Sequence, residues 1–259
     1  MKLKKLSVCT ILQDEEEVLP YFLTFIEKSI GFDILAEIVF VDGGSTDKSL
    51  DIIRNWNNGC EVKIIHNKFK SFGKQKNIGL ENCTGEWILS LDVDMTCTTN
   101  FRKELLAGAF NGCVLWDFKL FFTMLDKFHH SPVAGATTRL FRNYLGIKYI
   151  WDIHEHPVLL FKEIGLDYSK EADRKKAFDL MHSDGRLGFS AEVTFFEHSL
   201  RISDEGLLKR GKRTYNMREA SAKRGIKINR KNRYLTRRDG TINNKRVTIF
   251  PEKIRKIIP

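Results

Sequence analysis

An α/β fold, with a mostly parallel central sheet flanked by helices, is predicted by three features of this sequence. Short apolar runs alternate with helical patterns over the first hundred residues, as in successive βα units. Polar residues follow the carboxyl end of each run, where ligands of open α/β sheets bind. With 259 residues and 42% hydrophobic content, the chain can also bury a sizeable core.

The elements of the first half follow from the apolar periodicity. We expect strands at Leu6 to Leu12, Glu37 to Val41, Val62 to Ile65 and Trp87 to Leu91, and helices at about Val18 to Ser29, Thr46 to Trp56 and Gly73 to Asn82. Ser45 is a candidate N-cap of the second helix, because its hydroxyl can accept a hydrogen bond from an unpaired backbone N–H. Asp47 in the first turn suits the positive end of the helix dipole.

The second half has a different pattern of longer runs. Strands are expected at Cys113 to Phe122, Thr137 to Phe141 and Tyr149 to Leu160, followed by a less regular stretch to about Ser203 and a charged helix from Asp204 to about Arg224. From Gly225 onward the periodicity fades. We therefore divide the chain into one domain, residues 1–203, and a basic C-terminal helix and tail, residues 204–259.

The charge is unevenly distributed between these parts. Residues 209–259 hold 18 Lys and Arg against three Asp and Glu, a net +15, whereas residues 1–208 carry a net −5. Clustered positive charge attracts anionic lipid headgroups, phosphorylated glycolipids or nucleic acid. The alternative is a solvated helix with a loose basic end. The tail lacks a recognisable RNA-binding or helix-turn-helix pattern, which makes nucleic acid the less favoured partner.

The cysteines and the hydropathy of the chain indicate its cellular compartment. The five cysteines show no C-x-x-C pair, and their odd number argues against a secreted disulfide framework. The apolar start is followed at once by Asp14 and Glu15 with no cleavage site, so we interpret it as a buried strand rather than a signal peptide. No run approaches the roughly 18 to 20 apolar residues of a membrane span. We expect a cytoplasmic protein, and its basic tail suggests peripheral binding at the inner face of the membrane.

The strongest chemical pattern is an apolar strand that ends in two carboxylates, Asp92 and Asp94. Carboxylates two residues apart at a strand end can hold Mg²⁺ or Mn²⁺ together with diphosphate oxygens. A third carboxylate, Asp42, ends an earlier strand just before a glycine turn. Glycines permit close approach, so Asp42 is a candidate acceptor for hydrogen bonds from a nucleotide base or ribose. Each pattern also has a structural explanation, as a helix cap or a turn.

Taken together, four motifs resemble those of family 2 glycosyltransferases with the GT-A fold. The motifs are Leu12-Gln13-Asp14-Glu15-Glu16, Val41 to Asp47, Gln75-Lys76-Asn77-Ile78-Gly79 and Leu91 to Asp94, in the family's order over residues 6 to about 100. Three departures stand out: Asp14 replaces the usual Asn, Gly43 a common second Asp, and Lys76 an Arg. Lysine keeps the charge there but loses the bidentate fork of arginine.

This resemblance implies a function and a set of site residues. It implies an inverting, metal-dependent transfer of a hexose from a UDP-sugar to a glycan or glycolipid acceptor, with Mn²⁺ or Mg²⁺ as cofactor. Residues 1–100 would form the nucleotide-sugar half and residues 101–203 the acceptor half. The residues expected to bind the donor are Thr10, Leu12, Glu15, Asp42, Lys76, Asn77 and Asp92, with Asp94 as a metal ligand. Further along, Glu197-His198-Ser199-Leu200 resembles the family's His region, which makes His198 the candidate that completes the metal shell.

In the second half, Trp151-Asp152-Ile153-His154-Glu155 resembles a His-Glu segment of bacterial relatives that build lipopolysaccharide core and surface glycans. The resemblance makes Glu155 the candidate general base for the acceptor hydroxyl. His154 and His156 are candidate acceptor contacts or structural residues. A zinc hydrolase site is disfavoured, since the HExxH spacing is absent.

Two alternatives remain open at this point. A sugar nucleotidyltransferase would carry a glycine-rich phosphate loop after the first strand, but Thr10 to Glu17 contains no glycine. The other alternative is a non-enzymatic protein that binds nucleic acid or a membrane surface through its basic tail.

Overall fold

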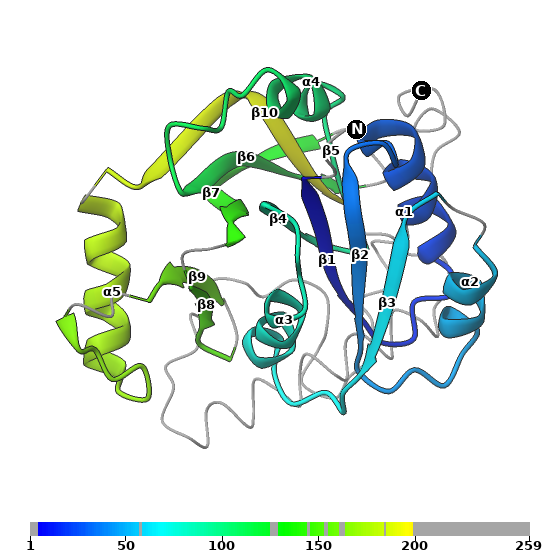
Figure 1. Ribbon diagram of the computed structural model, residues 1–259, viewed down its shortest axis with the longest axis horizontal. Helices are drawn as coiled ribbons and strands as arrows, with labels where there is room; N and C mark the ends of the chain where they lie inside the picture. Colours follow the sequence, from blue (N-terminus) through cyan, green and yellow to red (C-terminus); the bar gives the residue numbers. More distant parts are fainter. Residues whose placement is uncertain are drawn as a thin grey trace.

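A mixed sheet forms the centre of the computed structural model, which describes residues 5–56, 59–124, 129–143, 146–152, 155–160, 164–183 and 185–198 (Figure 1). In these ranges eight strands pair in the order β3-β2-β1-β4-β7-β6-β10-β5. Their bounds are β1 Leu6–Leu12, β2 Leu35–Asp42, β3 Glu61–His66, β4 Trp87–Asp92, β5 Met95–Cys97, β6 Leu115–Met124, β7 His129–Arg142 and β10 Leu187–His198. β8 (Ile147–Ile150) and β9 (His156–Leu159) form a separate antiparallel pair.

The first four strands by position, β3, β2, β1 and β4, are parallel to their neighbours, and β7 then pairs antiparallel with β4. The helices are α1 (Leu19–Phe25), which continues into the π-helical turn η1 (Ile26–Ile30), α2 (Ser49–Asn55), α3 (Phe72–Glu81), α4 (Asn100–Leu106) and α5 (Glu171–Ser183). This arrangement confirms the predicted α/β class with a central sheet flanked by helices.

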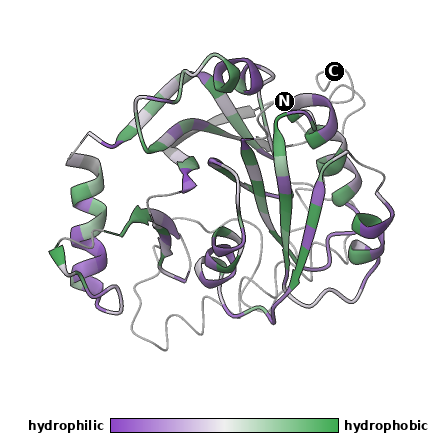
Figure 2. Ribbon diagram, in the orientation of Figure 1, coloured by the Kyte–Doolittle hydropathy of each residue, from purple (hydrophilic) through white to green (hydrophobic). Residues whose placement is uncertain are grey.

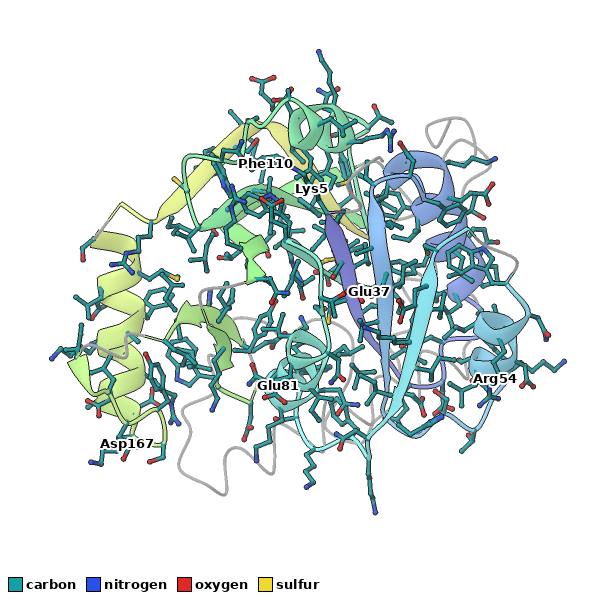
Figure 3. The ribbon with its side chains drawn as sticks, viewed as in Figure 1. Lys5, Glu37, Arg54, Glu81, Phe110 and Asp167 are labelled. Atoms are coloured by element: carbon teal, nitrogen blue, oxygen red, sulfur yellow. The ribbon has the colours of Figure 1, made fainter. Side chains whose placement is uncertain are left out.

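Successive side chains of each strand point to opposite faces of the sheet, so the core forms two clusters. Phe40 belongs to the cluster that includes residues of α1 and α4, while its neighbour Val41 belongs to the cluster that includes Leu80 of α3 and Tyr149 of β8. Phe110, labelled in Figure 3, stacks on Phe101 of α4 within the first cluster. Figure 2 shows β1 and β2 mostly in the hydrophobic colour, as expected of central parallel strands covered on both faces.

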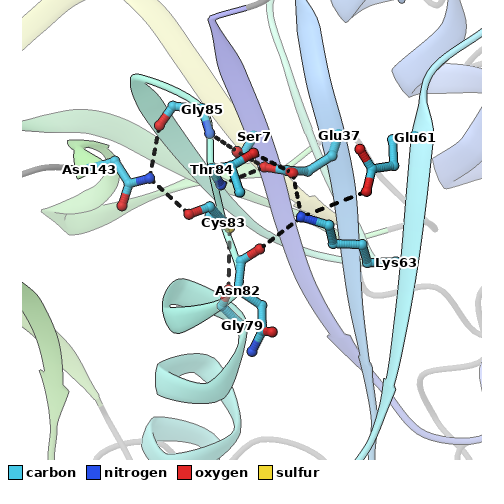
Figure 4. Close-up of polar contacts among 10 residues, drawn as sticks. All are labelled: Ser7, Glu37, Glu61, Lys63, Gly79, Asn82, Cys83, Thr84, Gly85 and Asn143. Atoms are coloured by element: carbon cyan, nitrogen blue, oxygen red, sulfur yellow. Dashed lines mark hydrogen bonds and ion pairs between the residues drawn. The ribbon is translucent and has the colours of Figure 1, made fainter.

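Glu37 is the exception in β2, a carboxylate with 1% side-chain exposure (Figure 4). It accepts hydrogen bonds from the hydroxyl of Ser7, from Lys63 Nζ at 2.7 Å, and from Thr84 through both its hydroxyl and its backbone N–H. Burial raises the pKa of this carboxyl, but the hydrogen bonds outweigh burial and hold the pKa at about 2. The cluster thus joins β1, β2, β3 and the loop before β4 around one buried charge.

Several local predictions are corrected by the structure. The expected strand from Tyr149 to Leu160 is two strands, β8 and β9. Ser45 does not cap α2, which begins at Ser49. Its hydroxyl instead accepts a hydrogen bond from the backbone N–H of Asp14, because the two loops pair with each other. The stretch expected to be irregular before Ser203 contains α5 and β10.

The predicted helix from Asp204 and the basic tail, residues 209–259, lie outside the described residues. Across the ranges that are described, every helix is too short or too polar to traverse a lipid bilayer.

Candidate active site

Parallel pairing brings two predicted carboxylates to one edge of the sheet. In register, Leu12 at the end of β1 lies opposite Asp42 of β2, and Ile11 lies opposite Asp92 of β4. Asp42 and Asp92 therefore flank the end of the same strand. This is the edge of an α/β sheet at which ligands bind.

Asp92 lies between two positive charges. Lys76 Nζ of α3 is 3.0 Å from one carboxylate oxygen of Asp92, and Arg139 Nη1 of β7 is 3.1 Å from the other. Both cations are buried, with side chains 5% and 10% exposed, whereas Asp92 keeps 29% exposure. Asp92 is thus a partly exposed anion that is paired with two buried cations.

The charges explain the protonation states. Burial raises the pKa of Asp92, but Lys76 and Arg139 outweigh it and hold that pKa at about 2. Burial lowers the pKa of Lys76, yet the negative charges of Asp92 and Glu155 keep it above the usual lysine value. Both groups are consequently charged at neutral pH.

Glu155 reaches the same lysine from the other half of the chain. Its carboxylate lies 2.7 Å from Lys76 Nζ, and its side chain is 14% exposed. It precedes β9, and the break between β8 and β9 is what allows this residue to leave the strand and turn toward α3. Lys76 therefore holds Asp92 and Glu155 together.

The β8 strand is fixed to α3 by the amide of Asn77. This side chain donates to the backbone carbonyl of Tyr149 at 2.9 Å and accepts from its N–H at 2.7 Å. The Tyr149 hydroxyl donates to Ser90 of β4 at 2.9 Å, and its ring lies 5.4 Å from Lys76 Nζ. Asn77, expected to bind the donor, is thus engaged in joining two elements of the fold.

At the other end of the edge, Asp42 is enclosed by its own loop. It is 2% exposed and accepts a hydrogen bond from the backbone N–H of Ser45, and its second oxygen lies 3.3 Å from His66 Nδ1. Asp14, with a left-handed φ of 54°, accepts from the N–H and hydroxyl of Thr46. The two loops that follow β1 and β2 are therefore linked into one wall.

Three other expected donor-binding residues lie in or near this wall. Thr10 is 1% exposed, and its hydroxyl is buried without a hydrogen-bond partner among the described residues. Leu12 is buried and its carbonyl accepts from Gly43 N–H. Glu15 is buried, and its backbone N–H donates to Ser49. Thr10 and Leu12 could therefore meet a ligand only through small movements or backbone atoms.

Excess negative charge gathers around Asp94 and Glu197. Burial, together with the nearby charges of Asp94 and Asp92, raises the pKa of Glu197 to about 8. A divalent cation would relieve this repulsion, and Mg²⁺ in proteins is often held by one or two carboxylates plus substrate phosphates. The donor set thus fits a metal shared with a diphosphate.

The expectation that Asp92 and Asp94 hold a cation together stays a prediction. Lys76 and Arg139 pair with Asp92 and would compete with a metal for that carboxylate. Within the described residues no group of three or more His, Cys, Asp or Glu converges as a complete metal shell. His154 and the side chain of His198 lie outside what the structure describes. His156 packs edge-on against Trp151 and Phe178, a structural position.

Arg139, Tyr149 and Glu197 belong to the site but were not predicted as site residues. The one local signal for Arg139 is a charged residue at an inward position of the apolar run Thr137 to Phe141. Tyr149 carries no such signal, and the one signal for Glu197 is its place directly before His198 in the segment that resembles the family's His region.

Comparisons with known proteins bear on the family and the fold of this chain. The family model for glycosyl transferase family 2 matches residues 7–157. A TPR repeat-containing protein of Synechococcus elongatus is 30% identical over 161 residues, covering 58% of this chain and 35% of its own length. The lipopolysaccharide core biosynthesis glycosyltransferase LpsC of Rhizobium meliloti is 29% identical over 108 residues, 40% of this chain and 38% of its own. This chain thus spans little more than a third of either curated relative.

Solved structures show the same fold at low identity. TarS 1–349 of S. aureus superposes with a TM-score of 0.52 and 18% identity, over 82% of this chain and 65% of TarS 1–349. TarS 1–349 was also solved in complex with UDP. The mannosyltransferase PcManGT of Pyrobaculum calidifontis, in complex with GDP-Man and Mn²⁺, gives 0.53 and 14% over 85% of this chain and 65% of PcManGT. These likenesses confirm the predicted GT-A fold.

Proposed function

The chain belongs to glycosyl transferase family 2, and from that premise we propose that it transfers a hexose from a UDP-sugar to a hydroxyl of a glycan or glycolipid. Family membership confirms the class predicted from the sequence, a glycosyltransferase, and argues against the sugar nucleotidyltransferase. The observation that carries the proposal is the Lys76 contact with both Asp92 and Glu155 at the carboxyl edge of the sheet.

The proposed roles follow from position and charge. Asp42 and the linked loops around Asp14 and Glu15 would hold the nucleoside. Asp92, kept ionised by Lys76 and Arg139, would orient the donor sugar or its diphosphate. Thr10 and Leu12 would contribute backbone contacts. UDP-sugar and GDP-sugar complexes among proteins of the same fold support a nucleotide-sugar donor.

Glu155 is proposed as the general base of an inverting transfer. Its carboxylate is ion-paired with Lys76 and partly exposed, so it can accept the proton of an acceptor hydroxyl as that oxygen attacks the anomeric carbon. Lys76 would keep the base at a fixed distance from Asp92. An in-line attack on the face opposite the leaving diphosphate inverts the anomeric configuration.

Asp94 is the proposed protein ligand of Mn²⁺ or Mg²⁺, with Glu197 beside it and His198 as the further ligand suggested by the resemblance. The ion would stabilise negative charge on the departing nucleoside diphosphate. Manganese in the PcManGT complex supports the presence of a metal in this fold.

A hydrolysis screen tests the proposal directly. UDP-, GDP- and dTDP-sugars are incubated with the protein and Mn²⁺, Mg²⁺ or EDTA, and released nucleotide is measured. We expect metal-stimulated turnover of a UDP-sugar, abolished in Asp94→Asn and kept in Asp179→Asn, an exposed aspartate on α5. Metal-stimulated hydrolysis that persists in a folded Asp94→Asn protein would contradict the metal assignment.

The domain division and the tail are part of the same proposal. Residues 1–203 would form the catalytic domain, and the net +15 of residues 209–259 would draw the protein to anionic lipid near a lipid-linked acceptor. Co-sedimentation of the full chain with vesicles containing phosphatidylglycerol, over a salt titration and with RNA as competitor, tests this. Stronger binding to RNA than to vesicles would overturn it.

A further inference from the structure

A cavity of about 310 Å³ opens between the start of α3, β8 and the turn that leads into α5, next to the proposed transfer site. Asp167, labelled in Figure 3, marks that turn. The volume is at the lower end of the range for small-ligand sites. Its lining includes three basic side chains and three aromatic ones: Lys74, Lys148, Arg174, Tyr149, Trp151 and Tyr168.

Two lysines give the cavity a positive balance. Lys74 and Lys148 are exposed, and neither ammonium has an ion pair or hydrogen bond within the described part of the chain. Arg174, by contrast, is paired with Glu171 at 2.6 Å and donates to the carbonyls of Tyr168 and Ser169. The carboxylate in the lining is Asp152, so the two lysines leave the cavity with a positive balance that favours an anion.

Three aromatic residues, Tyr149, Trp151 and Tyr168, also line the cavity. Trp151 has a left-handed φ of 66°, a conformation that is strained for a bulky residue. Its indole N–H donates to Glu171 at 3.0 Å, which holds the ring beside the cavity. Flat aromatic faces next to polar groups suit a sugar ring, whose C–H face is apolar and whose edge carries hydroxyls.

Gly73 lines the cavity and lies close to the proposed base. A Cβ at this glycine would lie 2.2 Å from the Trp151 carbonyl oxygen and 3.5 Å from the Glu155 Cβ. At this glycine, α3 therefore lies in close contact with the segment that carries Glu155. The nucleoside wall around Asp42 belongs to a different part of the edge.

We propose that this cavity binds an acidic sugar of the acceptor, one that carries a phosphate or a carboxylate, through Lys74, Lys148 and the aromatic lining. The proposal rests on the glycosyl transfer proposed above, since it identifies the chemical class of the acceptor for that site. A sugar bound here would bring the neighbouring hydroxyl of the acceptor toward Glu155.

Direct binding to the full chain tests it without any donor. Glucose 6-phosphate, glucuronate, glucose and inorganic phosphate are titrated by isothermal calorimetry. We expect both acidic sugars to bind about tenfold more tightly than glucose or phosphate. The double variant Lys74→Ala/Lys148→Ala should lose that advantage, and the matched pair Lys175→Ala/Lys176→Ala, exposed lysines of α5 outside the lining, should keep it. Whichever acid binds more tightly identifies the group recognised.

Equal affinity for glucose and its acidic forms, phosphate binding as tight as the acidic sugars, or the same loss in both double variants would overturn the proposal. Thermal melting of each variant confirms that it is folded. Failure of the proposed function is separate, because it is measured as absence of nucleotide-sugar hydrolysis by the wild-type protein. Lysine-dependent binding of an acidic sugar by a protein without that hydrolysis would leave the cavity's ligand class standing and contradict the proposed turnover of a nucleotide-sugar donor.

Discussion

Lys76 Nζ lies 2.7 Å from the carboxylate of Glu155, so one side chain of α3 links the segment before β9 to the end of β4. The same ammonium is 3.0 Å from Asp92. Two negative charges from distant parts of the sequence are thus held by one buried cation.

Replacing Lys76 by methionine should affect stability and activity together. Removal of one partner from a buried ion pair typically costs about 3 to 5 kcal/mol of stability. Because Arg139 still neutralises Asp92, we expect the free energy of unfolding to fall by about 3 kcal/mol. Loss of the fixed charge should lower kcat/KM by about 100-fold or more. Urea unfolding and donor hydrolysis measure the two effects.

Lys76→Arg and Lys70→Met are the matched comparisons. The arginine keeps the charge and should retain most of the stability, while Lys70 is exposed and its loss should leave both quantities unchanged. If Lys76→Met were as stable and active as Lys70→Met, the linking role of Lys76 would be wrong.

Glu155→Gln should separate donor binding from transfer. The amide keeps the size of the side chain but cannot take a proton, so transfer should fall about 10²- to 10⁴-fold. UDP-sugar affinity, measured by calorimetry, should change little because the nucleoside wall lies around Asp42. Glu81→Gln, at the exposed end of α3, serves as control. Transfer at the wild-type rate would place the base elsewhere.

The parts of this site that sequence predicts are those fixed by local pattern. Asp42 and Asp92 follow apolar runs, and because parallel strands end at a common edge, their proximity follows from the strand assignment. Lys76 and Glu155 were located through a family resemblance rather than through periodicity. Their mutual contact depends on where β8 ends. The apolar pattern of Tyr149 to Leu160 predicts one continuous strand and gives no sign of that end.

The rest depends on long-range pairing. Arg139 reaches Asp92 because β7 pairs antiparallel with β4, with Leu140 opposite Leu89, and that register is set by contacts across the sheet. Glu197 meets the charges of Asp94 and Asp92 because β10 pairs with β5. No spacing within the sequence indicates either pairing, so neither residue could be assigned to the site.

The Glu37 cluster predicts a pH dependence of stability. The folded-state pKa of about 2 lies below the usual value of 4.5, so its contribution is fully present above pH 4.5 and is lost as the pH falls toward 2. At about 1.4 kcal/mol per pKa unit this amounts to roughly 3 kcal/mol. Urea unfolding between pH 7 and pH 2.5 measures it.

Glu37→Gln is the variant that isolates this effect. An amide can keep part of the hydrogen bonding to Ser7 and Thr84 but carries no charge for Lys63. The variant should be less stable than wild type at pH 7, and the difference should shrink as the pH approaches 2.5. A constant difference across that range would show that the charge of Glu37 contributes nothing.

Gly73→Ala tests how closely α3 and the Glu155 segment must approach. The new methyl would lie 2.2 Å from the Trp151 carbonyl oxygen, a backbone atom that cannot rotate away, so the segment must shift. Overpacking of this kind typically costs about 1 to 3 kcal/mol, and displacement of Glu155 should lower transfer further than the stability loss explains. Gly112→Ala, where a Cβ meets nothing within 4 Å, should stay within about 0.5 kcal/mol of wild type. Comparable melting and transfer in the two alanine variants would mean that the close approach at Gly73 has no part in positioning the base.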